Sequence, residues 1–153
     1  MMGEQQVISD EIFPPIDEEQ TIKKVRHFLG KVLPQAVRAS GHSVADLRSP
    51  NMDGMPKSAP AGNKAEERIT RRLYAEQVVQ QSIVAMNNCD HECQVILDQL
   101  YLQDYSDTMC YMAIGYSKTQ YFDRWKPLAM LQFAQCYMLE DLNVYENRTQ
   151  TGL

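Results

Sequence analysis

The residues of this chain best suited to specific chemistry lie in the segment 117–126, where short polar, cationic and aromatic side chains alternate. Lys118 and Thr119 stand at the start of a predicted helix, and residues at that position of a protruding helix contact base edges in the major groove of DNA. One turn later, Phe122 can contact a thymine methyl group and Asp123 can accept a hydrogen bond from cytosine N4. The alternative reading of Phe122 is an ordinary core side chain.

Other side chains nearby suit the DNA backbone rather than the bases. Arg124 and Lys126 are flexible cations, and contacts from such groups to phosphate position a protein without reading sequence. Ser106 and Thr108 lie at the start of the preceding predicted helix, whose free backbone amides can hold a phosphate. Together these residues predict a surface that binds double-stranded DNA.

The elements that must position these residues are two helices joined by a tight turn, within the segment 106–137. Ser106 is a capping residue for the first helix, and Gly115 ends it, because glycine adopts a positive φ at low cost. Ser117 can cap the second helix, and Gln120 three residues on can complete a capping box, which would occupy its amide. The second helix then carries an apolar stripe at i, i+4 and i+7: Tyr121, Trp125 and Leu128.

Helices joined by so short a glycine turn cross steeply, which leaves the start of the second helix protruding. That arrangement is typical of the helix-turn-helix, whose second helix enters the major groove. The alternative is a plain helical hairpin with a glycine cap that reads no DNA.

Other candidate chemistry is weaker. The run Cys89-Asp90-His91-Glu92-Cys93 contains zinc-ligand types at a permitted spacing, but no second pair follows at the spacing of a zinc finger. We therefore expect no metal and no cofactor. The sequence shows no Ser/His/Asp set, paired catalytic carboxylates, phosphate-binding loop or dinucleotide fingerprint, so we do not expect an enzyme.

The charge of the chain is strongly segregated. The formal net charge is −5, yet residues 22–72 carry eleven Lys and Arg against four acids, and residues 73–114 carry six acids and no Lys or Arg. A chain with such blocks can offer basic surfaces to phosphate despite its acidic total. No apolar run approaches the roughly 18 residues of a membrane span, and the N-terminus has no signal-peptide pattern. We expect a cytoplasmic protein that does not bind membranes.

The remaining segments also have helical periodicity, so the predicted fold class is all-α. Asp17, with Gln20 three residues on, can cap a helix that runs to about Val32, where Pro34 ends it or begins a short second piece. A long helix is expected from Lys64, with its core face on Ile69, Leu73, Tyr74, Val78, Val79, Ile83 and Met86. Asp90 can cap the next helix, with Ile96, Leu97, Leu100 and Tyr101 inward, and the last helix extends to about Asp141.

The predicted organisation has a helical N-terminal region over 1–39, a linker or arm over 40–63, a DNA-binding domain over 64–142 and a tail over 143–153. The linker is inferred from three Gly, four Ser and three Pro between Ser40 and Asn63, with little periodicity. We expect the piece up to about Arg48 and the domain from about Lys64 to fold separately, with proteolysis cutting the stretch between them.

The residues from Glu66 to Tyr137 resemble region four of sigma factors: a long helix, a packing helix with I-L-x-x-L-Y at 96–101, then a helix-turn-helix. More narrowly, the chain resembles ArpU-type phage regulators of late transcription, over residues 14–29, 47–76 and 114–134. The middle stretch is the most specific. The resemblance implies a phage or prophage regulator that acts on packaging or lysis genes in a bacterial host.

Two residues depart from the pattern. Tyr111 stands where such units usually place alanine, so either the helices lie wider apart or the tyrosine tilts outward toward phosphate. Pro127 falls inside the second helix, where it removes a backbone donor. We expect a straight helix from Ser117 to Lys126, with any bend beyond it.

These observations predict a sequence-specific DNA-binding transcription regulator that works as a homodimer or beside RNA polymerase. One alternative is a sigma-like interaction module that binds RNA polymerase or a phage assembly partner without reading DNA. Another is a small terminase-like protein that binds packaging DNA.

Overall fold

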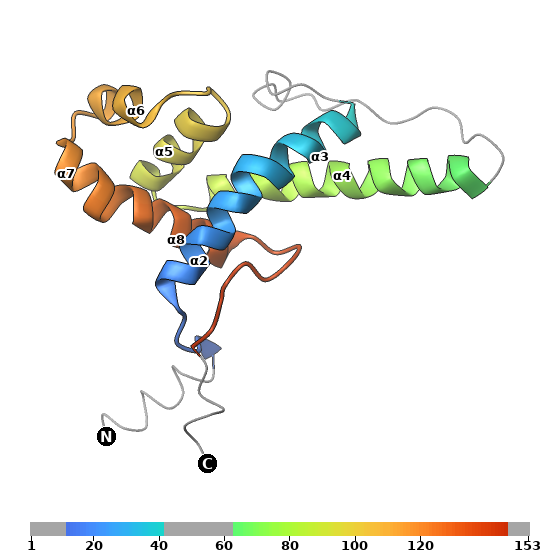
Figure 1. Ribbon diagram of the computed structural model, residues 1–153, viewed down its shortest axis with the longest axis horizontal. Helices are drawn as coiled ribbons and strands as arrows, with labels where there is room; N and C mark the ends of the chain where they lie inside the picture. The colour runs from blue at the N-terminus through green and yellow to red at the C-terminus, as the bar shows by residue number, and fades with distance from the viewer. Residues whose placement is uncertain (1–11, 42–62, 147–153) are drawn as a thin grey trace, which may run out of the picture.

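The computed structural model describes residues 12–41 and 63–146, and the part of the chain it describes forms helices and no strand (Figure 1). The predicted all-α class is confirmed. Along the chain the elements are α2 (Glu18–His27), η1 (Phe28–Val32), α3 (Leu33–Ser40), α4 (Asn63–Asn87), α5 (His91–Tyr101), α6 (Asp107–Ile114), α7 (Lys118–Gln120), η3 (Tyr121–Trp125) and α8 (Lys126–Cys136).

The first helix is longer than the sequence indicated, because α2, η1 and α3 follow one another without a break from Glu18 to Ser40. Its start is as predicted: Asp17 is the N-cap and accepts a 3.1 Å hydrogen bond from the Gln20 amide. Of the two alternatives for Pro34, the structure has the second: Pro34 stands in the first turn of α3, and the helical run continues past Val32.

Both prolines within helices follow a π-helical turn, η1 before Pro34 and η3 before Pro127. In each case the residue before the proline donates its N–H five residues back, Leu33 to Phe28 and Lys126 to Tyr121. A proline ring in a regular α-helix clashes with the carbonyl four residues back, and the wider π turn relieves that clash. The segment expected to be a straight α-helix, Ser117 to Lys126, therefore contains a π-helical turn from Tyr121 to Trp125.

The core face of α4 differs from the predicted one in its first half. Leu73 is 43% exposed and Tyr74 is 54% exposed, whereas Val78, Val79 and Met86 are buried as expected. Helix α4 packs along α3, and Figure 1 shows its first turns extending beyond the other described helices. In this half of α4 the small Ala75 is buried, whereas Leu73 and Tyr74 face outward.

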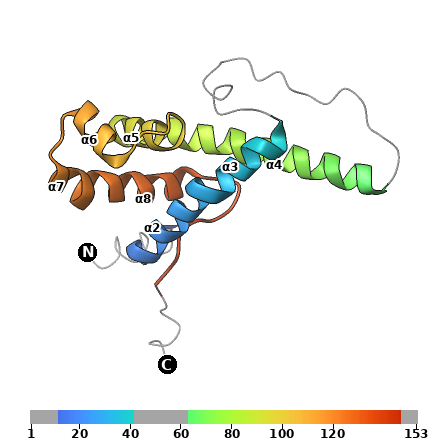
Figure 2. The same ribbon diagram turned by 45° about the horizontal axis from the view of Figure 1, so that its top comes forward.

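The N-terminal helix is part of the same hydrophobic core as the helices that follow. It packs along α4 and across α8, and Figure 2 shows α2 crossing α8. The Phe28 ring lies 5.9 Å from that of Phe133 and 4.8 Å from that of Tyr137. In the described residues, the N-terminal helix and the C-terminal helices thus share one core, whereas the sequence predicted two separately folding pieces. The predicted linker and its cleavage sites lie mostly in residues 42–62, outside the described residues.

The chain after α8 returns to the N-terminal end of α2. The last helix ends at Cys136 instead of Asp141, and Leu142 is buried. The Asp17 amide donates a 2.7 Å hydrogen bond to the Val144 carbonyl, and the Thr21 hydroxyl accepts one of 3.0 Å from the Val144 amide. The segment up to residue 146 is thus packed, and the tail does not begin at 143 as predicted.

Helix α5 begins at the residue expected, but its cap works differently. Asp90 occupies the N-cap position, but its side chain caps no backbone amide of α5. Its carboxylate instead accepts a 2.7 Å hydrogen bond from the side-chain amide of Gln132 in α8. Ile96 and Leu97 are buried as predicted. Among the described residues, no helix has the length and apolar character needed to cross a membrane.

Candidate nucleic-acid interface

The turn between α6 and α7 has the backbone that the sequence predicts. Ser106 caps α6 by accepting a 3.2 Å hydrogen bond from the Met109 amide. Gly115 ends α6 with a φ of 88°, in the left-handed region that glycine adopts most readily, and its amide donates to the Tyr111 carbonyl. Three residues, 115–117, separate the two helices.

The predicted capping box at Ser117 is confirmed. The Ser117 hydroxyl accepts a 3.1 Å hydrogen bond from the Gln120 amide, and the Gln120 side chain accepts one of 3.3 Å from the Ser117 amide. Two backbone donors at the start of the helix are satisfied in this way. The Gln120 side-chain oxygen is occupied in the box, as expected, and is not free to read a base.

Asp107, the first residue of α6, ties this helix to the one that follows the turn. One carboxylate oxygen accepts a 2.8 Å hydrogen bond from the Tyr121 hydroxyl and a 2.8 Å bond from the Lys126 ammonium. Burial alone would raise the pKa of Asp107, but these two bonds and the nearby charge of Arg26 outweigh it and lower that pKa. Burial and the bond to Asp107 raise the pKa of Tyr121, which therefore stays protonated.

This arrangement changes the expected role of Lys126. Its side chain is only 16% exposed and its ammonium is paired with Asp107. It also lies over the Phe122 ring, 5.6 Å from the centroid. Lys126 therefore helps to hold the two helices at a fixed angle. Because its ammonium already has a partner within the protein, we no longer assign it to a DNA phosphate.

Aromatic side chains fill the space between the two helices. The Tyr111 ring lies 5.6 Å from that of Tyr121 and 6.3 Å from that of Phe122, which meets Tyr121 edge-on at 5.0 Å. Tyr111 is half-buried in this cluster, so it serves as a packing residue in place of the usual alanine. Phe122 is 38% exposed, so part of its ring packs in this cluster and the rest is available to a binding partner.

Trp125 is half-buried and lies on the edge of the predicted core stripe. Its ring stacks on Tyr116 at 4.9 Å with an interplanar angle of 6°, and the Arg124 guanidinium lies 4.9 Å from its centroid. The apolar stripe predicted from the sequence includes Trp125, but its ring is only partly buried. Tyr121, in contrast, is completely buried as the stripe indicates.

The exposed residues of the first two turns after Ser117 include four that suit contacts with DNA, and we call this set the polar face of α7: Lys118 and Thr119 of α7, with Asp123 and Arg124 of η3. Ser106 and Thr108 are also exposed, at the start of α6. The structure thus brings together most of the predicted site residues, while Gln120 and Lys126 have intramolecular partners. The face offers donors, one acceptor and cations on a rigid helix.

Two residues that matter to this geometry did not emerge from the sequence. Asp107 is a first-turn acid, which the sequence alone treats as a generic helix-start residue. Arg26 comes from α2, more than seventy residues earlier, and its charge influences the pKa of Asp107 and Tyr101. No local pattern could have indicated that proximity.

The cysteine run shows no metal site. Cys89 and Cys93 are buried, and among the residues described no group of three His, Cys, Asp or Glu side chains converges. Burial, followed by the charges of Asp90 and Glu92, raises the pKa of Cys93 to about 11, which disfavours the thiolate that zinc binding requires.

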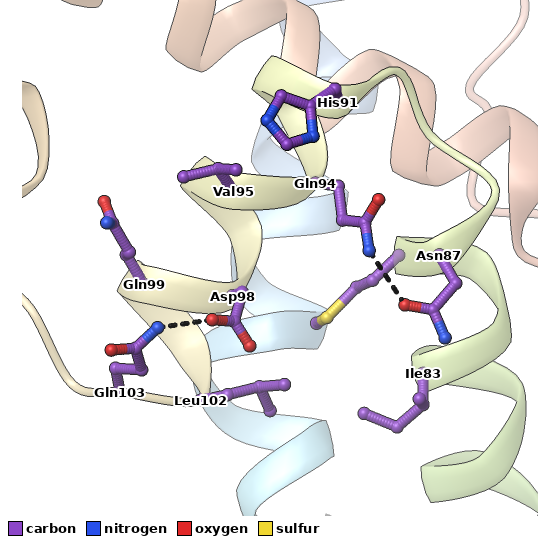
Figure 3. Close-up of a pocket in the computed structure, with 10 residues that line it drawn as sticks. Ile83, Asn87, His91, Gln94, Val95, Asp98, Gln99, Leu102 and Gln103 are labelled. Atoms are coloured by element: carbon purple, nitrogen blue, oxygen red, sulfur yellow. Dashed lines mark hydrogen bonds between the residues drawn. The ribbon is translucent and has the colours of Figure 1, made fainter. Parts of the chain in front are cut away.

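A groove of about 340 Å³ lies between α4 and α5 (Figure 3). Its floor includes Ile83 and Leu102, and its rim carries hydrogen-bonded polar pairs. Gln94 donates to Asn87 at 3.1 Å, and Gln103 donates to Asp98. The groove has mixed apolar and amide character and no cationic side chain among its lining residues.

Comparison with known proteins gives one informative similarity. The chain is 28% identical over 126 residues to a protein of Enterococcus hirae named "Putative autolysin regulatory protein ArpU", covering 80% of this chain and 89% of that protein. No protein-family model matches the chain, and no solved structure is significantly similar to it. Over most of its length, this chain is therefore similar to an ArpU regulatory protein.

Proposed function

We propose that this protein is a sequence-specific, double-stranded-DNA-binding transcription regulator whose helix-turn-helix is formed by α6 and the helix beginning at Lys118. The observation that carries the proposal is the rigidly held polar face of α7. Its first turn is fixed by the Ser117 capping box, and its angle to α6 is fixed by the bonds from Tyr121 and Lys126 to Asp107. A reading helix needs this kind of fixed, exposed first turn.

The polar face provides the contacts that such reading requires. Lys118 and Thr119 lie in the first exposed turn and suit the edges of bases. Asp123 suits cytosine N4, and the exposed edge of Phe122 suits a thymine methyl group. Arg124 is the exposed cation of the face's second turn and suits a phosphate.

The regulatory role is supported by the similarity to ArpU, whose name describes a regulator of autolysin. We extend this to control of phage or prophage packaging or lysis genes inside the bacterial host cell. In this role the protein acts as a homodimer or beside RNA polymerase, and it has no catalytic activity.

The test is a genome-wide map of binding sites for the full-length protein in its host, followed by gel-shift assays on the recovered duplexes. Discrete sites near lysis or packaging genes, bound in vitro with affinity above that for shuffled duplexes, would support the proposal. Absence of any gel shift at low salt would contradict it.

A second candidate function is a protein-interaction module that binds RNA polymerase or a phage assembly partner. The groove between α4 and α5 favours it, because mixed apolar and amide surfaces suit a peptide or helix from another protein. The gel shifts separate the two: the purified interaction module would not by itself shift the duplexes recovered from the binding map.

A further inference from the structure

The helix formed by α2, η1 and α3 has a cationic outer surface. After Glu19, no acid occurs in it, and its exposed side chains include Lys23, Arg26, His27 and Lys31. Lys24 also belongs to this run, but its ammonium donates a 3.1 Å hydrogen bond to the Asp141 carbonyl. The opposite surface of the helix is buried in the core through Val25, Phe28 and Leu29.

The helix that carries these cations packs on α8, the C-terminal continuation of the proposed reading helix. Figure 2 shows α2 crossing α8. The charge of Arg26 also acts on the start of α6, where it contributes to lowering the pKa of Asp107. Asp107 is already paired with Lys126, and among the described residues Arg26 makes no ion pair of its own. Lys23 lies 3.9 Å from Glu19 one turn earlier, but both side chains are exposed, and such a surface pair is weak enough for a phosphate to replace the carboxylate.

We propose that Lys23, Arg26 and Lys31 of this helix bind backbone phosphates of duplex DNA flanking the bases that α7 reads. The inference rests on the proposed function and assigns a second contact surface to it. Phosphates run continuously along the duplex on either side of a groove, so cations on a helix packed against the continuation of a reading helix meet the next phosphates. A lipid surface would require an exposed apolar face, and the apolar face of α2 is in the core.

The proposal is tested by the salt dependence of binding. The full-length protein is titrated into a fluorescent mixed-sequence duplex long enough to span three helical turns, at salt concentrations between about 50 and 200 mM. In the triple variant Lys23→Gln, Arg26→Gln and Lys31→Gln, the slope of log affinity against log salt should become shallower by about two to three, or roughly 0.9 per lost contact. An unchanged slope would overturn the proposal.

A matched control removes the same charge elsewhere. Lys64, Arg68 and Arg71 are exposed cations in the first turns of α4, at the opposite end of the molecule from α7 (Figure 1). The triple glutamine variant at these positions should keep the wild-type slope. Equal losses in both variants would show a general effect of net charge and would overturn the assignment to α2. Thermal unfolding midpoints equal to that of the wild type would verify that both triple variants are folded.

The outcome also separates this inference from the proposed function. If the wild-type protein binds no duplex, the proposed function fails and this inference fails with it. If Lys118→Ala and Thr119→Ala reduce discrimination between sequences while the α2 variant keeps its salt slope, only the α2 inference is overturned.

Discussion

The hydroxyl of Tyr121 donates a 2.8 Å hydrogen bond to the carboxylate of Asp107, joining the buried face of the final helix to the first residue of α6. Tyr121 is fully buried, so this bond is sheltered from water on one side. Lys126 reaches the same carboxylate oxygen one turn later. The crossing of the two helices is thus fixed by one acid that has no part in the polar face of α7.

Replacing that acid should loosen the helix pair. Asp107→Ala leaves the Tyr121 hydroxyl and the poorly exposed Lys126 ammonium without a partner, and we expect a loss of about 1–3 kcal/mol in the free energy of unfolding. Asp123→Ala, which removes an exposed acid, is the control and should change stability by less than about 0.5 kcal/mol. Urea unfolding measures both, and equal effects would show that the Asp107 bonds are not stabilising.

The same site predicts a pH dependence. The pKa of Asp107 is lower in the folded protein than in the unfolded chain, so its ionised form stabilises the fold. That contribution is complete above the unfolded pKa of about 3.9 and is lost as pH falls through the folded pKa. The stability difference between wild type and Asp107→Asn should be constant from neutral pH down to about pH 5 and narrow below about pH 4. A difference that stays constant into strong acid would contradict the assignment.

Substitution by alanine at two glycines should change the stability of the protein in opposite directions. Gly30 is exposed in η1, and no atom lies within 4 Å of the position its Cβ would take, so Gly30→Ala should stabilise by about 0.5–1 kcal/mol through helix propensity. Gly115 also has open space, but its φ of 88° disfavours alanine, and Gly115→Ala should cost about 1–2 kcal/mol. Thermal or urea unfolding measures whether each variant is more or less stable than the wild type. Destabilisation by Gly30→Ala would show that η1 depends on glycine.

The N-terminal helix should be required for the stability of the C-terminal helices. Phe28 is 2% exposed and contacts the rings of Phe133 and Tyr137, so Phe28→Ala should cost about 3–5 kcal/mol. The chain has a single tryptophan, Trp125, whose fluorescence reports unfolding of the C-terminal helices. In Phe28→Ala, the fluorescence transition should move to a lower urea concentration, together with the transition that circular dichroism shows for the helices. A fluorescence midpoint unaffected by Phe28→Ala would show two independent folding units.

Variants of the final helix should separate reading, positioning and folding. Lys118→Ala and Thr119→Ala should reduce discrimination between specific and nonspecific duplexes by about 1–3 kcal/mol per lost base contact. Arg124→Ala should weaken binding to all duplexes alike. Lys126→Ala should chiefly lower stability, because its ammonium is held by Asp107. Competitive gel shifts measure the first two effects, and an unchanged specificity ratio for both Lys118→Ala and Thr119→Ala would place the reading surface elsewhere.

The sequence by itself determined the features that depend on residues close together in the chain. The Ser106 cap, the positive φ of Gly115 and the capping box between Ser117 and Gln120 all involve partners within four residues, so their spacing is visible in the sequence. The buried positions of Tyr121 and Ile96 follow from the helical period in the same way.

Only the tertiary structure decided which distant side chains meet. Lys126 has an ordinary surface pattern in sequence, yet its partner Asp107 lies nineteen residues away and leaves it little exposed. The docking of α2 on α8 and the exposure of Leu73 depend likewise on which helix faces pack together. Helical periodicity identifies an apolar face, but its neighbour is selected by the packing of the whole core, to which every element contributes at once.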